Sequence, residues 1–243
     1  MGLVFNGTKD ISENTLVREI VQEIRENRKF FIYLARLFAD YKKNDSSLIS
    51  EIHVQIDNIL NSPRLKYSSI KKTFLSKTLK AIYDETEKKF HVIRAQILED
   101  TVFYLGPFSG ITRKECFIEP VIKDYQTSGE EKVVGDSDIK CDCVYFLDEG
   151  NPLEFVECKA DIANVIPKTL PFEKAKRDHQ RKVLYLDNAF NYLSANYSPP
   201  IIYFACYNLN YGIMLNNLHN NWGFKNMNFI NAEEIINGKK RRA

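Results

Sequence analysis

The chain has 243 residues, of which 44% are hydrophobic and 27% charged, and its formal net charge is +2 at pH 7. This is an ordinary globular composition, and the length allows one large domain or a core with an appended module. The small net charge means that any basic contact with nucleic acid has to be local. The most apolar stretch, residues 30–38, is too short to span a bilayer.

The cysteines and the first residues indicate the cellular compartment. Five cysteines, an odd number, have spacings that match no disulfide framework, which is typical of a reducing environment. No signal-peptide pattern opens the sequence. We therefore expect a soluble, cytoplasmic protein that does not bind membranes.

The N-terminal part of the chain is predicted to be helical. Apolar residues recur at spacings of three and four over residues 11–41. Asp45-Ser46-Ser47 is a start signal for a helix ending near Leu60, and Ser62-Pro63 provides a cap and a first-turn proline for a third helix. Residues 61–89 are rich in lysine, which suits a helix lying along phosphates or an ordinary solvated face. We assign residues 1–88 to a helical region for oligomerisation, DNA binding or partner binding.

A further helix is predicted to end at Gly106-Pro107. Its apolar positions form one stripe, and Glu99 and Asp100 lie beside that stripe. A short strand over residues 116–122 and a polar loop over residues 124–131 follow.

A β-hairpin is predicted between residues 139 and 158. Two runs of strand-forming residues, Ile139–Leu147 and Leu153–Cys158, flank the polar, Gly-containing residues 148–151. The second run is apolar on both faces apart from its glutamates. A charge in such a strand is costly unless it is paired or bound to an ion.

The register of this hairpin predicts a metal site. If the hairpin is symmetric about Glu149-Gly150, Asp142 lies opposite Glu157, and strand alternation puts Lys159 on the same face. Two neighbouring carboxylates repel each other unless a cation lies between them, and their hard oxygen atoms suit Mg²⁺ or Mn²⁺. A lysine beside them can stabilise an attacking hydroxide or a developing phosphoryl charge.

The same register predicts that Cys141, Cys143 and Cys158 share the opposite face of the hairpin. Three thiols on one face could form a zinc site or pack as small hydrophobic residues. We favour packing, because free cysteines are among the most buried residue types.

After the hairpin, a helix is predicted over residues 172–193, with basic residues concentrated in its first half. Pro199-Pro200 then precedes the apolar run 201–206, which is typical of a buried parallel strand. Strand, hairpin, helix and strand in this order predict a mixed sheet flanked by helices.

Asp142, followed by Glu157-Cys158-Lys159 at the end of an apolar strand, resembles the motif of the PD-(D/E)xK nuclease superfamily. Cys141 occupies the position of the family's proline, a departure that many members share. The resemblance implies that Asp142, Glu157 and the Cys158 backbone carbonyl bind Mg²⁺ or Mn²⁺. It also implies that Lys159 supports the nucleophile.

The resemblance extends over roughly residues 99–206 and includes both flanking helices. In the family, a glutamate of the first helix reaches the metal, which implies Glu99 here, with Asp100 as the alternative. A basic or amide residue of the later helix lies near the scissile phosphate, which implies Gln180, Arg181 or Lys182. The residues of that helix region expected to bind nucleic acid are Lys174, Lys176, Arg177, Arg181 and Lys182.

The implied fold is an α/β (α+β) protein in which a mixed-sheet, restriction-endonuclease-like core over residues 89–243 follows the helical region. The implied function is a Mg²⁺-dependent DNA endonuclease of the restriction or phage-defence type, with RNA as the other candidate substrate, acting as a homodimer or larger oligomer. Two alternatives remain. One is a catalytically inactive module of this fold that binds nucleic acid or a partner protein. The other is an enzyme acting on another substrate such as a nucleotide, although no Gly-rich phosphate loop supports it.

Overall fold

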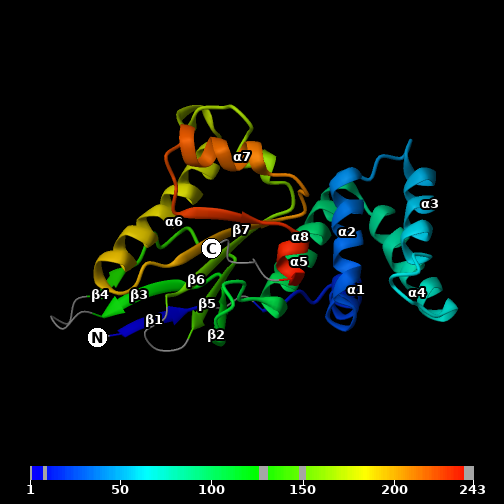
Figure 1. Cartoon of the computed structure of the whole chain (residues 1–243), viewed down its shortest axis with the longest axis horizontal. Coiled ribbons are helices and arrows are strands. Elements are labelled where there is room, and N and C mark those ends of the chain that lie inside the picture. The colour runs from blue at the N-terminus through cyan, green and yellow to red at the C-terminus, as the bar shows by residue number, and fades with distance from the viewer. Residues whose placement is uncertain (1, 8–9, 126–130, 148–151, 238–243) are drawn as a thin grey trace.

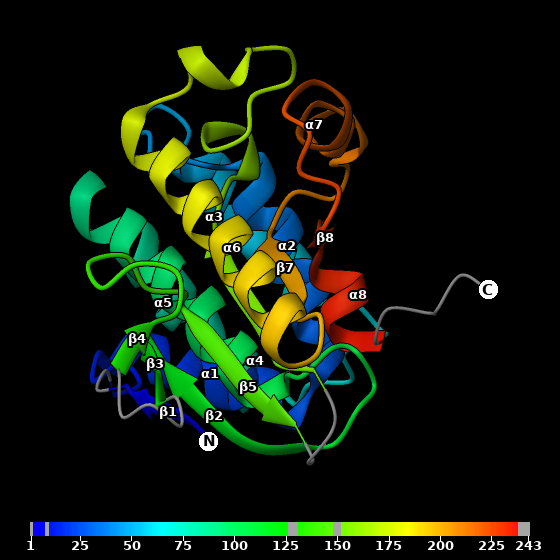
Figure 2. The same ribbon diagram turned by 90° about the vertical axis from the view of Figure 1, so that its left-hand side faces the viewer.

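The structure, a computed structural model, describes residues 2–7, 10–125, 131–147 and 152–237. Within these ranges the chain is a mixed α/β protein with eight α-helices and two β-sheets (Figures 1 and 2). The hairpin turn at 148–151, most of the predicted polar loop (126–130) and the basic C-terminal residues 239–242 lie outside the described residues. Among the described helices, none has the length and apolar character needed to cross a bilayer.

The N-terminal helices start and end at different residues from those predicted. A break at Asn27 divides the predicted helix over residues 11–41 into two. The third helix does not begin at Ser62-Pro63, because Ser68, whose hydroxyl accepts from the Lys71 amide, is the residue that caps it. The four helices are α1 (Thr15–Glu26), α2 (Arg28–Asp40), α3 (Ile49–Leu60) and α4 (Ser69–Tyr83).

Helix α5 (Glu87–Leu105) links the N-terminal helices to the larger sheet. It ends at Gly106, as predicted, and buries Phe90, Ile97 and Val102. These side chains belong to one hydrophobic cluster that also contains residues of α1–α4, of four strands and of the last helix, α8 (Ala232–Asn237). Because this core is shared, the proposed boundary at residue 88 remains a prediction.

The larger sheet has five strands in the order β2-β5-β6-β7-β8. The β2–β5 and β5–β6 pairs are antiparallel, whereas the β6–β7 and β7–β8 pairs are parallel, so the sheet is mixed as predicted. Strand β7 is the buried parallel strand that the apolar run predicted. The strands are β2 (Arg113–Ile118), β5 (Cys143–Leu147), β6 (Glu154–Lys159), β7 (Ile201–Cys206) and β8 (Met227–Ile230).

A second, three-stranded sheet was not predicted. The predicted strand over residues 116–122 is in fact two strands, because the chain turns at Glu119, which has a positive φ of 46°, and Pro120. Strand β2 ends before this turn and joins the larger sheet, while β3 follows the turn and joins the smaller one. The smaller sheet has the order β1-β3-β4 and consists of β1 (Gly2–Asn6), β3 (Val121–Tyr125) and β4 (Glu131–Val133).

Helices cover both faces of the larger sheet (Figure 2). Helix α5 packs on one face, and α6 (Arg177–Asn196) packs on the other through Val183, Leu186 and Ala189. The helix predicted over residues 172–193 starts later than expected, at Arg177, because residues 172–174 form a separate 3₁₀ turn. Helix α7 (Gly212–Asn216) follows β7. Strands β5 and β6 are thus enclosed between two helical layers.

Candidate functional site

The β5–β6 hairpin has the register that the sequence predicted. Cys143 lies opposite Val156, and Tyr145 lies opposite Glu154. The first strand is shorter than predicted, because β5 begins at Cys143 rather than at Ile139. Asp142 therefore lies in a bend one residue before the strand. Its side chain forms a hydrogen bond that is not part of the backbone pairing between β5 and β6.

Asp142, Glu157 and Lys159 lie close together at this end of the hairpin. Oδ2 of Asp142 accepts from the backbone N–H of Cys158 at 2.6 Å, which fixes Asp142 against β6. Nζ of Lys159 lies 2.6 Å from Oε1 of Glu157 and 4.0 Å from Oδ2 of Asp142. Glu157 is fully buried because β6 is the central strand and α6 covers that face. The three side chains converge as the register required.

Lys182 joins this group from α6. Its Nζ lies 3.0 Å from the Glu157 carboxylate and also donates to the backbone carbonyl of Lys140. The sequence suggested Lys182 as a nucleic-acid contact, but only 20% of its side chain is exposed. Lys182 is therefore part of the buried charge cluster, and Glu157 has two ammonium partners.

A pocket of about 240 Å³ opens beside Asp142. Glu99 of α5 lines it, in the place that the family resemblance implies. Asp100 lines it too, and its carboxylate accepts from the Ser12 backbone N–H at 3.2 Å. Local sequence patterns did not reveal the other polar lining residues, since β1 and α5 bring them together; these are Asp10, Ser12, Glu13 and Gln96.

Electrostatics distinguish the two central carboxyl groups. Burial raises the pKa of Asp142 to about 7, and the charges of Glu157 and Glu99 add to this effect against the opposing lysines. Burial also acts to raise the pKa of Glu157, but the ammonium groups of Lys159 and Lys182 outweigh it, so that this pKa is lowered. Asp142, next to the pocket, is therefore the carboxyl group that the two lysines compensate least.

These residues fit a hard divalent cation in part. Asp142 and Glu99 offer carboxylate oxygens to one pocket, and a cation there would offset the burial and the smaller repulsion that raise the Asp142 pKa. Glu157 is already neutralised, so it could bind the cation only if an ammonium group moved. Over the described ranges, no three His, Cys, Asp or Glu side chains are grouped as a ready-made metal site. The metal-binding role of the Cys158 carbonyl stays a prediction.

The other predicted residues lie at the start of α6 and in the turn before it. The Gln180 amide donates to the Phe172 carbonyl at 2.7 Å, which ties α6 to the preceding 3₁₀ turn. Its proposed role at the scissile phosphate stays a prediction. The exposed basic residues, which remain available to an anionic ligand, are Lys174, Lys176, Arg177 and Arg181.

The predicted common face for three cysteines is wrong. Cys143 and Cys158 pack in the hydrophobic cluster beneath α5, whereas Cys141 packs in the cluster beneath α6. The cause is the bend at Asp142, which breaks strand alternation before β5 begins. All five cysteines are free thiols, and Cys141, Cys143 and Cys158 are buried as small hydrophobic residues.

Comparison of the chain with protein-family models, with curated proteins and with solved structures finds no significant match. The functional argument therefore depends on the geometry of the hairpin and its neighbours.

Proposed function

We propose that this protein is a divalent-metal-dependent nuclease that hydrolyses phosphodiester bonds, with DNA as the preferred substrate. The observation that carries the proposal is the convergence of Asp142, Glu157 and Lys159 at the end of one hairpin, with Lys159 Nζ 2.6 Å and 4.0 Å from the two carboxylates. Glu99 of α5 extends the group into a pocket. Two acids, a lysine and a third acid on a preceding helix form the arrangement implied by the PD-(D/E)xK resemblance.

The order of elements supports a restriction-endonuclease-like core. A helix bearing the candidate glutamate (α5) precedes a strand (β2), the hairpin β5–β6, a helix (α6) and a parallel strand (β7). The motif lies at the end of the hairpin, between the helices that cover the two faces of the sheet. The unpredicted sheet β1-β3-β4 is an addition to this core.

The side chains have distinct roles in the proposed hydrolysis. Asp142 and Glu99 would hold the divalent ion, which when bound supplies Lewis-acid activation of water and phosphate. Lys159 keeps its proton, because the carboxylates of Glu157 and Asp142 raise its pKa despite burial. It therefore acts as a fixed positive charge that orients and stabilises the nucleophile rather than as a base.

The exposed basic residues around the start of α6 support nucleic acid as the substrate. Lys174, Lys176, Arg177 and Arg181 provide positive charge near the candidate site, and a phosphodiester backbone is the polyanion that such a surface binds. Because each chain carries one such site, cutting both strands of DNA calls for a homodimer or larger oligomer.

A plasmid assay tests the proposal. Supercoiled DNA is incubated with the protein and Mg²⁺ or Mn²⁺, with and without EDTA, beside a structured RNA. We expect metal-dependent nicking of DNA that EDTA abolishes. Lys159→Ala should lose this activity, whereas Lys71→Ala, which removes a lysine bound to a buried glutamate on α1, should retain it.

The second candidate is an inactive module of the same fold that binds nucleic acid or a partner protein. The observation in its favour is that Glu157 already has two ammonium partners. DNA binding by gel shift without nicking in any metal, and without change in Lys159→Ala, would establish this alternative.

A further inference from the structure

Glu157 has one more cationic partner than its own charge requires. Lys159 lies 2.6 Å from Oε1 of Glu157, yet Lys182 lies 3.0 Å from the same atom. The Glu157 side chain is fully buried, so both interactions act in a medium of low dielectric constant. Two ammonium groups therefore contact one buried carboxylate.

Lys182 lies where a hard cation would find oxygen ligands. Its ammonium group contacts the Glu157 carboxylate on β6 and the backbone carbonyl of Lys140, two residues before Asp142. Carboxylate and carbonyl oxygens are the ligands that Mg²⁺ and Ca²⁺ use in proteins. The lysine therefore fills a position that has the chemistry of a cation site.

The two lysines differ in what they would lose if a second cation approached Glu157. Lys159 has another carboxylate, Asp142, at 4.0 Å, so it stays attracted to the site. The second oxygen that Lys182 contacts belongs to a neutral carbonyl. The Asp142 charge attracts both lysines, but it is Lys159 that lies 4.0 Å from its carboxylate, so displacing Lys182 from Glu157 breaks fewer close charge–charge contacts than displacing Lys159.

We propose that Lys182 is an internal cation that a divalent metal ion has to displace from Glu157, and that it weakens metal binding for this reason. Lys182 is a positioning residue in this role, because it acts through the carboxylate that it holds. The inference rests on the proposed function and adds Glu157 to the metal ligands Asp142 and Glu99 once an ammonium group has moved. It accounts for the second ammonium partner of the buried glutamate.

The test measures Mn²⁺ binding by isothermal titration calorimetry at pH 8 without nucleic acid. Lys182→Gln should bind Mn²⁺ about tenfold more tightly than the wild type, because a competing positive charge is gone. Lys182→Arg keeps that charge and should bind as the wild type does. Lys89→Gln removes a lysine from the exposed first turn of α5 and should leave the affinity unchanged.

A purely structural role for Lys182 gives a different pattern. In that case Lys182→Gln would have a lower melting temperature than the wild type, and its Mn²⁺ affinity would be unchanged or weaker. This result would overturn the inference but leave the nuclease proposal intact. Lys182→Met keeps the apolar stem of the side chain and is the second variant should Lys182→Gln not fold; it too should bind more tightly. If wild type and variants all fail to bind Mn²⁺ at millimolar concentration, the inference and the proposed function fail together.

Discussion

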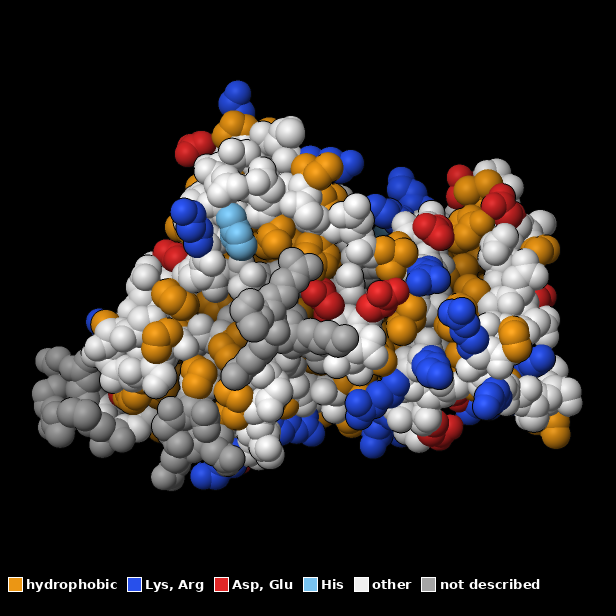
Figure 3. All heavy atoms as spheres, viewed as in Figure 1, with side chains coloured by type: hydrophobic (Ala, Val, Ile, Leu, Met, Phe, Trp, Pro, Cys, Tyr) orange, Lys and Arg blue, Asp and Glu red, His pale blue; other side chains and the backbone are white. Residues whose placement is uncertain are grey.

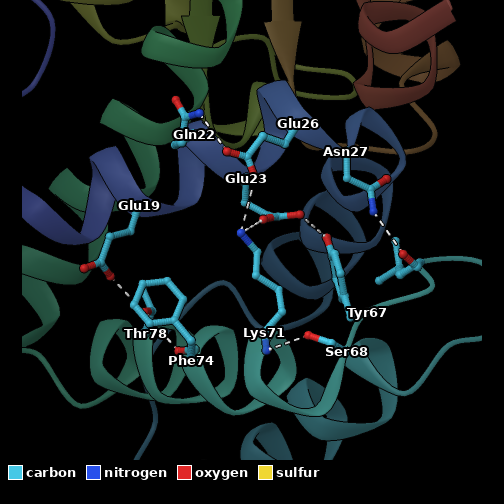
Figure 4. A network of polar contacts seen from close by, with 11 residues as sticks. Glu19, Gln22, Glu23, Glu26, Asn27, Tyr67, Ser68, Lys71, Phe74 and Thr78 are labelled. Atoms are coloured by element: carbon cyan, nitrogen blue, oxygen red, sulfur yellow. Dashed lines mark hydrogen bonds and ion pairs between the residues drawn. The ribbon is translucent and has the colours of Figure 1, made fainter.

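Two regions of the molecule each bury a glutamate against a lysine, and they differ in what surrounds the pair. Glu23 on α1 is 2% exposed, accepts from the Tyr67 hydroxyl at 2.6 Å and forms an ion pair with Lys71 (Figure 4). Glu157 on β6 is 0% exposed and pairs with Lys159 and Lys182. Burial and pairing alone therefore do not distinguish a functional carboxylate from a structural one.

The difference lies in the neighbouring carboxylates. In the α1–α4 network, Glu19 accepts from the Thr78 hydroxyl and Glu26 accepts from the Gln22 side-chain amide, so each acid has a donor of its own besides the shared Lys71 (Figure 4). Beside Glu157, Asp142 and Glu99 share one pocket, and the Asp142 pKa rises to about 7. Carboxyl groups held together against their mutual repulsion, next to open space, are the stronger indication of a site.

Matched substitutions of the two glutamates give the largest expected difference. Glu157→Gln should reduce the rate of plasmid nicking about 10³-fold, because the carboxylate that holds Lys159, the proposed stabiliser of the nucleophile, is lost. Glu23→Gln, the same chemical change in the other network, should leave the rate unchanged. Single-turnover nicking at saturating Mg²⁺ measures both.

Circular dichroism of both variants separates catalysis from folding. If Glu23→Gln lowers the rate as much as Glu157→Gln while both stay folded, the distinction between a structural and a functional glutamate is wrong.

The raised Asp142 pKa predicts how stability depends on pH. The folded-state pKa of about 7 lies above the ordinary value of about 3.9, so between these pH values the folded protein holds a proton that the unfolded chain has released. This contribution to the free energy of unfolding is complete below pH 4 and is lost as pH rises to 7, with a total of about 4 kcal/mol at most. Asp142→Asn cannot ionise at this position and therefore lacks this pH-dependent contribution to the free energy of unfolding.

Urea unfolding of the wild type and Asp142→Asn at several pH values between 4.5 and 8, without divalent ions, measures this effect. We expect Asp142→Asn to gain stability relative to the wild type as pH rises to about 7, and the difference to stay constant above that. Parallel pH profiles for the two proteins would show that Asp142 is ionised throughout.

A smaller effect is expected in the α1–α4 network. Tyr67→Phe removes the hydroxyl that donates to the buried Glu23 carboxylate, and should lower the free energy of unfolding by about 2 kcal/mol without changing nicking. Tyr41→Phe removes an equally short bond to Glu51 on the surface and should have less effect. Equal losses in urea unfolding would mean that Glu23 is not buried as described.

The hairpin register was predictable because it depends on local rules. Strand alternation and a symmetric turn were enough to predict that Asp142, Glu157 and Lys159 lie close together, although Asp142 lies just before β5 and bonds to the Cys158 N–H. The same rule failed for Cys141, because the strand begins only after the bend at Asp142. Strand alternation predicts side-chain direction only within the strand itself, and β5 begins at Cys143.

The rest of the site could not be predicted, because it depends on how distant elements pack. Lys182 reaches Glu157 only because α6 crosses the face of the larger sheet, and its basic neighbours in the sequence stay exposed. Asp10 lines the pocket in the segment between β1 and α1, which contacts α5 through the hydrogen bond from the Ser12 N–H to Asp100, and local sequence patterns do not predict such a contact.

The smallest expected effects concern where nucleic acid binds. Lys and Arg side chains also gather over the N-terminal helices (Figure 3), so α4 and α6 are rival surfaces. Arg181→Gln on α6 should weaken DNA binding a few-fold and reduce the slope of log affinity against log salt by about 1, whereas Lys77→Gln on α4 should change neither. Fluorescence anisotropy at several salt concentrations measures this. The opposite pattern would place the phosphates along the helical region and away from the carboxylates, which a nuclease with its site at Asp142 does not allow.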